Sequence, residues 1–227
     1  MTKIKICGLT TPQEAGWVSK AQADYAGMVL FFPKSKRNIT IDQAKEIMKY
    51  LPPQIRKVAV VVSPSALQIK EIQENGFDIV QIHGQVLPEA LETLQIPFFR
   101  AFNVDNMQEW ERYEAEPKCI GYVFDAVKPG SGETFDWSSI PNLPEDGKPY
   151  LLAGGLNPAN VGNAIEAMHP DGVDVSSGVE RDLEPGKDPE KIEAFVKTVR
   201  KASYSVNQIT STLICLIYQI QRCRQST

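Results

Sequence analysis

The stretch KIKICGLTTPQEAGWVSKA, residues 3–21, contains the repeating unit from which the fold of this chain is predicted. It opens with isoleucines that alternate with polar residues, which is the pattern of a half-buried β-strand. In such a strand Lys5 and Cys7 share one face and the isoleucines share the other. The Thr-Pro pair at 11–12 then marks a helix start, because proline is favoured at the first helical position. The stretch therefore predicts a strand, a turn and a helix.

The same order recurs along most of the chain. Strands are predicted at 3–7, 25–31, 57–62, 78–82, 97–102, 120–125, 150–153 and 172–176. Helices are predicted at 11–21, 41–51, 64–75, 88–94, 105–115, 158–168 and 188–201, with Ser63-Pro64 and Asn157-Pro158 as further helix starts. Eight such units favour an α/β fold, a single-domain (βα)8 TIM barrel. An open doubly wound sheet is the alternative, but no G-x-G-x-x-G follows the first strand, which disfavours its dinucleotide-binding form.

Composition narrows the class of protein. The 227 residues carry a formal net charge of −4 and are 42% hydrophobic, which suits one soluble domain of barrel size. This mild acidity predicts no nucleic-acid partner, and no apolar run approaches the ~20 residues of a membrane span. No signal peptide is expected, since lysines interrupt the first strand. The four cysteines are scattered, so we expect no metal site, no disulfide framework and a cytoplasmic location.

Polar residues stand at the carboxyl ends of several predicted strands, where barrels of this kind carry their sites. They are Cys7, Gln81, His83, Asp125, Asp174 and Ser176, with a basic run at 34–37. Each one alone has an ordinary structural interpretation, such as a small buried cysteine or a solvated basic loop. Their shared position at one rim is what predicts a site.

Glycines follow the last two predicted strands. Gly154 and Gly155 come after the strand at 150–153, and Ser177 and Gly178 after the strand at 172–176. Barrels that act on phosphorylated sugars often hold the phosphate with these two loops, because glycines let backbone N–H groups approach an anion. Ordinary turn glycines are the alternative for either loop alone. Together the loops predict a phosphate site.

Six blocks, which occur in family order, resemble phosphoribosylanthranilate isomerase over roughly residues 3–201. They are KICGLT (5–10), FPKSKR (32–37), VQIHG (80–84), GSGETFDW (130–137), AGGLNPANV (153–161) and VDVSSGVE (173–180). The resemblance implies a cofactor-free Amadori rearrangement of N-(5-phosphoribosyl)anthranilate to 1-(2-carboxyphenylamino)-1-deoxyribulose 5-phosphate in tryptophan biosynthesis. The partner is then a small phosphorylated substrate, and the chain a monomer or homodimer.

The resemblance also implies roles for single residues. Cys7 is the general base that removes the C2′ proton, and Asp125 is the general acid that protonates the ring oxygen. A free thiol has a pKa near ~8.5, so we expect the pKa of Cys7 to be lowered, with Lys5 as one source. Arg37 is expected to bind the anthranilate carboxylate, and Gln81 and His83 to line the substrate pocket.

The role of Lys5 is open between two interpretations. Asp174 alternates with valines in the strand that neighbours 3–7 in a closed barrel, so it should point inward as Lys5 does. A buried lysine needs a partner, and Asp174 is the natural one. Lys5 either tunes Cys7 or simply pairs with Asp174 and holds the barrel together.

Residues 203–227 depart from the family pattern, so we divide the chain into a barrel domain at 1–202 and a C-terminal extension at 203–227. The extension has no acidic residue, and its apolar residues recur at helical spacing. An added helix, a disordered extension and a non-native end remain alternatives.

Three other functions are alternatives for this chain. The related histidine-pathway barrel isomerase resembles two repeated half-barrels with paired aspartates, and this chain has no half-chain repeat. Indole-glycerol-phosphate synthase would need a lysine and glutamate pair that cannot be placed here. The third alternative is a non-catalytic barrel that binds a phosphorylated ligand. The presence of both Cys7 and Asp125 argues against it.

Overall fold

Eight parallel strands form the centre of the molecule, in a computed structural model that describes residues 1–103, 110–125 and 146–204. The strands are β1 (Lys3–Ile6), β2 (Tyr25–Leu30), β4 (Arg56–Val62), β5 (Ile79–His83), β6 (Phe98–Asn103), β7 (Cys119–Asp125), β8 (Tyr150–Leu152) and β9 (Gly172–Val175). Each lies within one residue of its predicted bounds at either end. A two-residue strand, β3 (Asn38–Ile39), pairs with β2 and was not predicted from the sequence.

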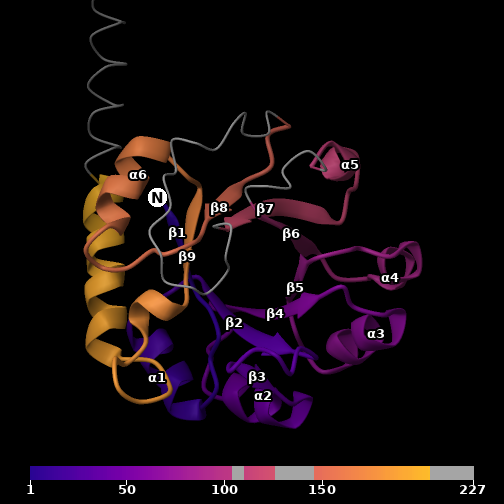
Figure 1. Cartoon of the computed structure of the whole chain (residues 1–227), viewed down its shortest axis with the longest axis horizontal. Coiled ribbons are helices and arrows are strands. Elements are labelled where there is room, and N and C mark those ends of the chain that lie inside the picture. Colours follow the sequence, from indigo (N-terminus) through magenta and orange to yellow (C-terminus); the bar gives the residue numbers. More distant parts are fainter. Residues whose placement is uncertain (104–109, 126–145, 205–227) are drawn as a thin grey trace, which may run out of the picture.

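Helices follow most of the strands and lie outside them (Figure 1). They are α1 (Pro12–Lys20), α2 (Ile41–Met48), α3 (Ala66–Glu74), α4 (Pro88–Thr93), α5 (Glu111–Glu114), α6 (Val161–Met168), the 3-10 helix η3 (Ser177–Val179) and a last helix whose described part is 189–204. The helix expected at 105–115 is described only from 110. No helix in the described part of the chain is long and apolar enough to cross a bilayer.

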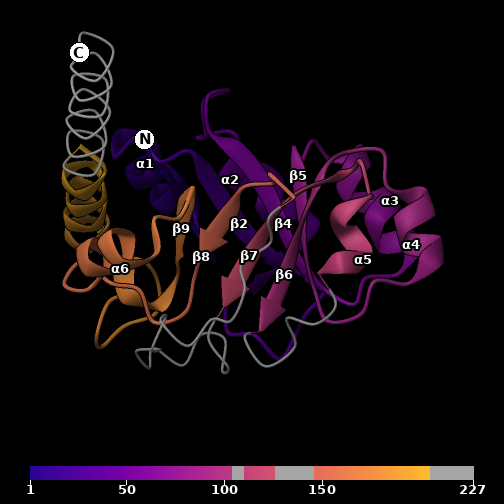
Figure 2. The same cartoon turned by 90° about the horizontal axis from the view of Figure 1, so that it is seen from above.

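The sheet closes on itself. Its order is β1-β9-β8-β7-β6-β5-β4-β2, and a parallel pairing of β1 with β2 joins the two ends. The arrowheads of β6, β7 and β8 point to the same side of the molecule in Figure 2. The (βα)8 barrel is confirmed, and the open sheet is wrong. Because all strands run in parallel, their carboxyl ends gather at one rim.

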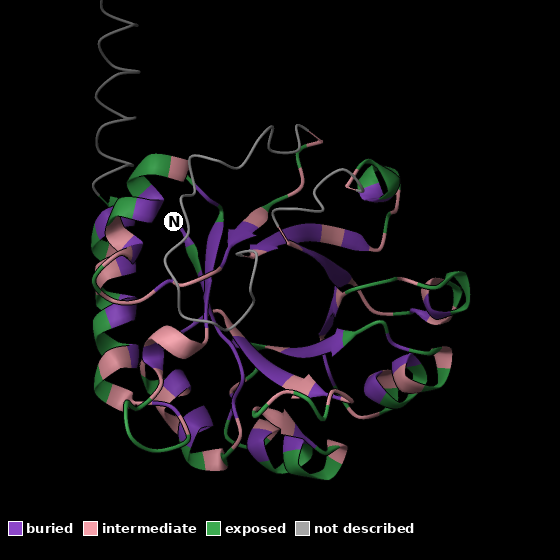
Figure 3. Cartoon of the chain, viewed as in Figure 1, coloured by how far each residue is buried: buried purple, intermediate pink, exposed green. Residues whose placement is uncertain are grey.

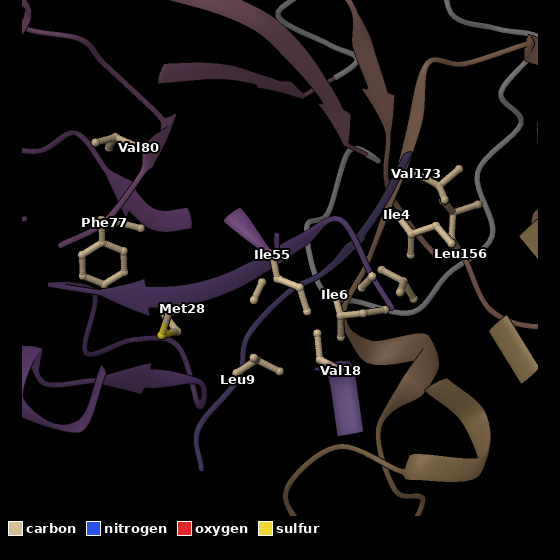
Figure 4. Close-up of a cluster of buried hydrophobic side chains, with 14 of the residues drawn as sticks. Ile4, Ile6, Leu9, Val18, Met28, Ile55, Phe77, Val80, Leu156 and Val173 are labelled. Atoms are coloured by element: carbon tan, nitrogen blue, oxygen red, sulfur yellow. The ribbon is translucent and has the colours of Figure 1, made fainter. Parts of the chain in front are cut away.

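Two apolar clusters follow from the alternation of side chains along the strands. Ile4 and Ile6 of β1 point outward into the layer between strands and helices, which Figure 4 shows with Val18 of α1 and Val173 of β9. The smaller cluster fills the barrel and includes Cys7 together with Val60, Phe99 and Val123, which are among its buried members. In Figure 3 the strands are almost entirely buried, while the helices expose their outer faces.

The helix starts are only partly as predicted. Thr11 caps α1 in a reciprocal capping box with Glu14, and Pro12 is the first helical residue. The other two proline-led starts are wrong. α3 begins two residues after Pro64, where the Ser65 side chain accepts from Gln68 N. α6 begins at residue 161, because the turn after residue 157 is stabilised by Asn side chains before the helix forms.

The last helix closes the layer beside β1. Ile192, Phe195 and Val199 are fully buried on its inner face. Ser203 is also buried and accepts a hydrogen bond from Thr2 N at 3.3 Å. The described helix thus runs to 204, two residues past the predicted domain boundary at 202. Residues 205–227, and with them most of the predicted extension, lie outside the described residues.

Candidate active site

A cavity of about 460 Å³ opens at the carboxyl ends of the strands. Its size falls in the range of small-molecule sites, and its position is where barrels of this fold hold their ligands. Of the residues singled out from the sequence it is lined by Cys7, Arg37, Gln81, His83, Asp125, Gly154, Gly155, Asp174, Ser176 and Ser177. The structure therefore brings together residues from six strands or the loops that follow them. The block GSGETFDW at 130–137 lies outside the described residues.

Cys7 stands where β1 leaves the barrel. Its backbone N–H donates to Val175 O of β9 at 2.8 Å, and its carbonyl accepts from Ser176 Oγ at 3.0 Å. On the other side Gly27 of β2 lies so close that a Cβ there would be 2.9 Å from Cys7 Sγ. These contacts hold Cys7 in place where it lines the cavity, and the residue is 9% exposed.

The protonation of Cys7 differs from expectation. Burial raises its pKa, and although the charges of Lys5 and Lys187 oppose this, the net shift is upward. The predicted lowering of the Cys7 pKa is therefore wrong, because desolvation of the thiolate outweighs the nearby cations. At neutral pH the group is a thiol.

Lys5 and Asp174 form an ion pair inside the barrel, with Nζ and Oδ2 2.7 Å apart. Neighbouring strands put the two residues in register, and their side chains are 0% and 7% exposed. Burial lowers the pKa of Lys5, but Asp174 and Cys7 raise it by more, so the ammonium keeps its charge. The predicted pairing is confirmed. A Cβ on Gly27 would lie 2.9 Å from Cys7 Sγ and 3.2 Å from Lys5 Nζ, so the thiol and the ammonium are also near each other.

Gln81 and His83 line the cavity from β5. Gln81 Nε2 and His83 Nε2 are 2.9 Å apart. Burial, with Lys5 and Arg100 adding to it, lowers the pKa of His83 to about 3. His83 is thus neutral at pH 7, and its Nε2 accepts from the Gln81 amide. Gln81 Oε1 is buried and has no hydrogen-bond partner among the described residues.

The glycine loop after β8 is locally well defined. Gly154 and Gly155 have φ of 87° and 66°, a conformation that favours glycine. The Asn160 side chain fixes the loop, since its Nδ2 donates to Gly155 O at 2.9 Å and its Oδ1 accepts from Asn157 N at 2.8 Å. The loop therefore presents backbone close to the cavity without a side chain in the way.

Gly178 has a different position from the other three residues predicted to bind phosphate. It is not among the residues that line the cavity. A Cβ on Gly178 would lie 1.9 Å from Leu156 O, so its lack of a side chain lets the loops after β8 and β9 meet. Ser177 lines the cavity beside this contact.

Two charged residues of the rim were not singled out by the sequence. Glu180 accepts from Arg37 Nε, and Lys187 Nζ lies 3.3 Å from Glu180 Oε1. Burial by itself would raise the pKa of Glu180, but Arg37 and the nearby lysines lower this pKa to about 2. Lys187 is 1% exposed. Glu180 ends the block VDVSSGVE, whereas Lys187 lies in an irregular loop that gave no signal.

Comparison with known proteins identifies the family. A family model described as N-(5'phosphoribosyl)anthranilate (PRA) isomerase matches residues 4–198. An N-(5'-phosphoribosyl)anthranilate isomerase of Streptococcus pneumoniae (strain Taiwan19F-14) is 41% identical over 201 residues, covering 88% of this chain and 96% of that relative. This chain belongs to the phosphoribosylanthranilate isomerase family.

Solved structures of the family agree. The enzyme from Thermotoga maritima is 36% identical with a TM-score of 0.77, over 88% of this chain and 100% of that one. A complex of phosphoribosyl anthranilate isomerase with reduced 1-(o-carboxyphenylamino)-1-deoxyribulose 5-phosphate is 34% identical with a TM-score of 0.75, over 88% and 100% of the two chains.

Family membership settles the alternatives among barrel enzymes. The chain is an isomerase of tryptophan biosynthesis. This excludes the two alternative assignments, to the histidine-pathway isomerase and to indole-glycerol-phosphate synthase. The described residues contain no group of three or more histidine, cysteine or acidic side chains that could hold a metal ion.

Proposed function

We propose that Cys7 is the general base and Asp125 the general acid in the Amadori rearrangement of N-(5-phosphoribosyl)anthranilate. The observation that supports this is that one cavity is lined by Cys7, which directly follows β1, and by Asp125 at the end of β7, at the rim where such barrels act. Asp125 gives its proton to the ring oxygen, the C1′–O bond breaks, and a Schiff base forms. Cys7 takes the C2′ proton, and the resulting enolamine tautomerises to the ketone.

The raised pKa of Cys7 bears on how it works as a base. The thiol must lose its proton before it removes one from carbon, and burial makes the free thiolate costly. Lys5 and Lys187 both favour the thiolate, so they lower this cost. Lys5 can act in this way while it pairs with Asp174. The two interpretations of Lys5 are thus compatible.

The remaining site residues are assigned to substrate binding. Arg37 binds the anthranilate carboxylate, since a guanidinium matches a carboxylate with paired N–H donors. Gln81 and His83 contact the ring or the ribose, where the unpartnered Gln81 Oε1 can accept from a hydroxyl. Gly154, Gly155 and Ser177 form the phosphate end, where backbone N–H groups replace the water around the anion. Gly178 contributes to this end by letting the loops after β8 and β9 meet. No cofactor takes part.

Two substitutions test the catalytic roles. Cys7→Ser and Asp125→Asn should each lower kcat by roughly 10²–10⁴-fold, the usual contribution of a general base or acid. The assay follows the loss of fluorescence of N-(5-phosphoribosyl)anthranilate. Cys119→Ser is the matched control, because Cys119 is a second buried cysteine that does not line the cavity. It should keep its activity.

The outcomes separate enzyme from binding protein. Normal kcat in either Cys7→Ser or Asp125→Asn would refute the role given to that residue. A parent chain that binds the reduced product analogue but has no turnover would instead support a non-catalytic barrel.

The oligomeric state and the location of the protein stay predictions. One of the Thermotoga maritima structures is described as monomers generated from a dimeric phosphoribosylanthranilate isomerase, which supports a homodimer here. Light scattering during gel filtration distinguishes the two states, and a mass of one chain would exclude the dimer. The cytoplasmic location rests on the cysteine usage and is tested by cell fractionation.

A further inference from the structure

Three cations converge on one carboxylate at the rim of the cavity. Glu180 accepts from Arg37 Nε, lies 2.7 Å from Lys36 Nζ and lies 3.3 Å from Lys187 Nζ. Lys36 is exposed, but the side chains of Arg37, Glu180 and Lys187 are 14%, 11% and 1% exposed. Charges with so little water around them interact strongly, so the geometry of this cluster is fixed.

The loop from 180 to 187 is folded so that its two ends meet. Glu180 and Lys187 form an antiparallel bridge, and Asp188 N donates to Val179 O at 2.8 Å. The Lys187 ammonium also donates to Ser176 O and Oγ at 3.1 and 3.2 Å. These contacts with Ser176 fix the Lys187 ammonium, which in turn holds the Glu180 carboxylate.

The Arg37 guanidinium is held at its Nε edge by Glu180. Its aliphatic stem passes over Gly8, where a Cβ would lie 2.5 Å from Arg37 Cδ. Nε is occupied by Glu180, whereas Nη2 is buried without a hydrogen-bond partner among the described residues. A buried guanidinium N–H without an acceptor is costly, which points to an acceptor from a ligand. Arg37 lines the cavity, so a bound anion can supply that acceptor.

We propose that Glu180, supported by Lys187, is a positioning residue that orients the Arg37 guanidinium so that its terminal nitrogens bind the carboxylate of the substrate. Glu180 does not itself touch the substrate. The inference rests on the proposed role of Arg37 as the carboxylate ligand and goes beyond it, because it names the residues that make this ligand selective.

The charges around Glu180 indicate that it orients Arg37 and does not simply neutralise it. Glu180 carries one negative charge against the three basic groups around it. Burial lowers the pKa of Lys187, and Glu180 opposes this shift. Without Glu180, Arg37 would face Lys187 with no anion between them and would be pushed from its place. Glu180 therefore keeps the Arg37 guanidinium at the rim and sets its orientation.

The experiment measures selectivity for the carboxylate. Inhibition constants are determined for the reduced product analogue and for the same compound without its carboxyl group. Glu180→Gln should weaken the first by about tenfold or more, the scale of a hydrogen bond to a charged group, and leave the second nearly unchanged. KM for the substrate should rise by a similar factor, with a smaller change in kcat.

Two further variants separate the inference from the role of Arg37. In an Arg37→Met background, Glu180→Gln should have no additional effect on selectivity, because it acts through the guanidinium. Glu184→Gln is the matched control, since Glu184 lies in the same loop and its ion pair with Arg181 is exposed. It should not change either constant.

Each result has one meaning. If Arg37→Met does not reduce selectivity, the proposed role of Arg37 fails. If Arg37→Met reduces it and Glu180→Gln does not, only the positioning role of Glu180 fails. Equal weakening of both compounds by Glu180→Gln also overturns the proposal, because it indicates general damage to the site. Binding of the carboxyl-free compound shows in every case that the variant is folded.

Discussion

The ion pair inside the barrel gives a strong prediction for stability. Asp174→Asn removes the anion from beside a fully buried ammonium, at a distance of 2.7 Å. At an effective dielectric constant of about 20, two charges at that distance attract by about 6 kcal/mol, and the cost of desolvation offsets part of this. We therefore expect Asp174→Asn to lower the free energy of unfolding by about 3–5 kcal/mol.

The measurement is urea unfolding followed by tryptophan fluorescence. Glu46→Gln is the control, because the pair of Glu46 with Lys49 is exposed and should contribute no more than about 1 kcal/mol. The double variant Lys5→Met/Asp174→Leu removes both charges and should be close to the parent in stability. A loss of less than about 1 kcal/mol in Asp174→Asn would refute the reasoning, since an unpaired buried charge would then cost nothing.

The double variant also resolves the role of Lys5. Lys5 lowers the pKa of Cys7 and Asp174 raises it, and Lys5 has the larger effect. A thiol acts as a base only after it loses its proton, so we expect kcat to rise with pH through the pKa of Cys7. Removing both charges should raise the pKa of Cys7 further and move this rise to higher pH. An unchanged pH profile in a stable double variant would mean that Lys5 only pairs with Asp174.

Three further predictions concern the rim. Gly27→Ala should lower kcat by about tenfold, because the new Cβ would lie 2.9 Å from Cys7 Sγ and displace the thiol; steady-state rates measure this. Gly178→Ala should weaken the binding of inorganic phosphate, because a Cβ 1.9 Å from Leu156 O forces the loops after β8 and β9 apart. Calorimetry measures this affinity. Burial lowers the pKa of His83 to about 3, so the unfolded chain takes up a proton near pH ~6.5 that the folded chain refuses, and stability should fall as pH drops below that value. Urea unfolding against pH should show His83 contributing up to about 1.4 kcal/mol per pH unit.

The controls for these predictions come from the same chain. Gly16→Ala places a methyl group where nothing lies within 4 Å, in the middle of α1, and should raise stability by about 0.5–1 kcal/mol without changing kcat. An equal loss of kcat in Gly16→Ala and Gly27→Ala would contradict the steric argument. Normal phosphate affinity in Gly178→Ala would contradict the contact between the loops. His83→Gln should flatten the acid limb, and an unchanged limb would assign it to other groups.

Local pattern predicted the strands and the site residues that follow them. The alternation of Ile4, Lys5, Ile6 and Cys7 is a property of any strand, so the inward face of β1 could be read directly. The closed parallel topology then brought Cys7 and Asp125 to one rim, since every strand ends on the same side. Periodicity and the barrel topology thus placed these residues at one rim, whereas their catalytic roles came from the family resemblance.

The same local signals misplaced two helix starts. Proline at positions 64 and 158 suits the first turn of a helix, but it suits a turn before the helix equally well. Asn157 and Ser65 decided the outcome by side-chain hydrogen bonds to backbone N–H groups. Such competition between neighbouring caps depends on small free energies that the pattern does not resolve.

The sequence by itself determined the order of strands and helices, the face on which each strand side chain lies, and the blocks that carry the family resemblance. Only the tertiary structure decided the electrostatics of the site. Glu180 meets Arg37 across 143 positions of the chain, and no local pattern indicated that contact. The pair of Lys5 with Asp174, 169 positions apart, could be predicted from strand alternation once a closed barrel was assumed, but its complete burial could not. The raised pKa of Cys7 likewise follows from burial, which no neighbouring residue reveals. The physical reason is that charge interactions depend on distance in space and on the surrounding water, and both are set by how the whole chain packs.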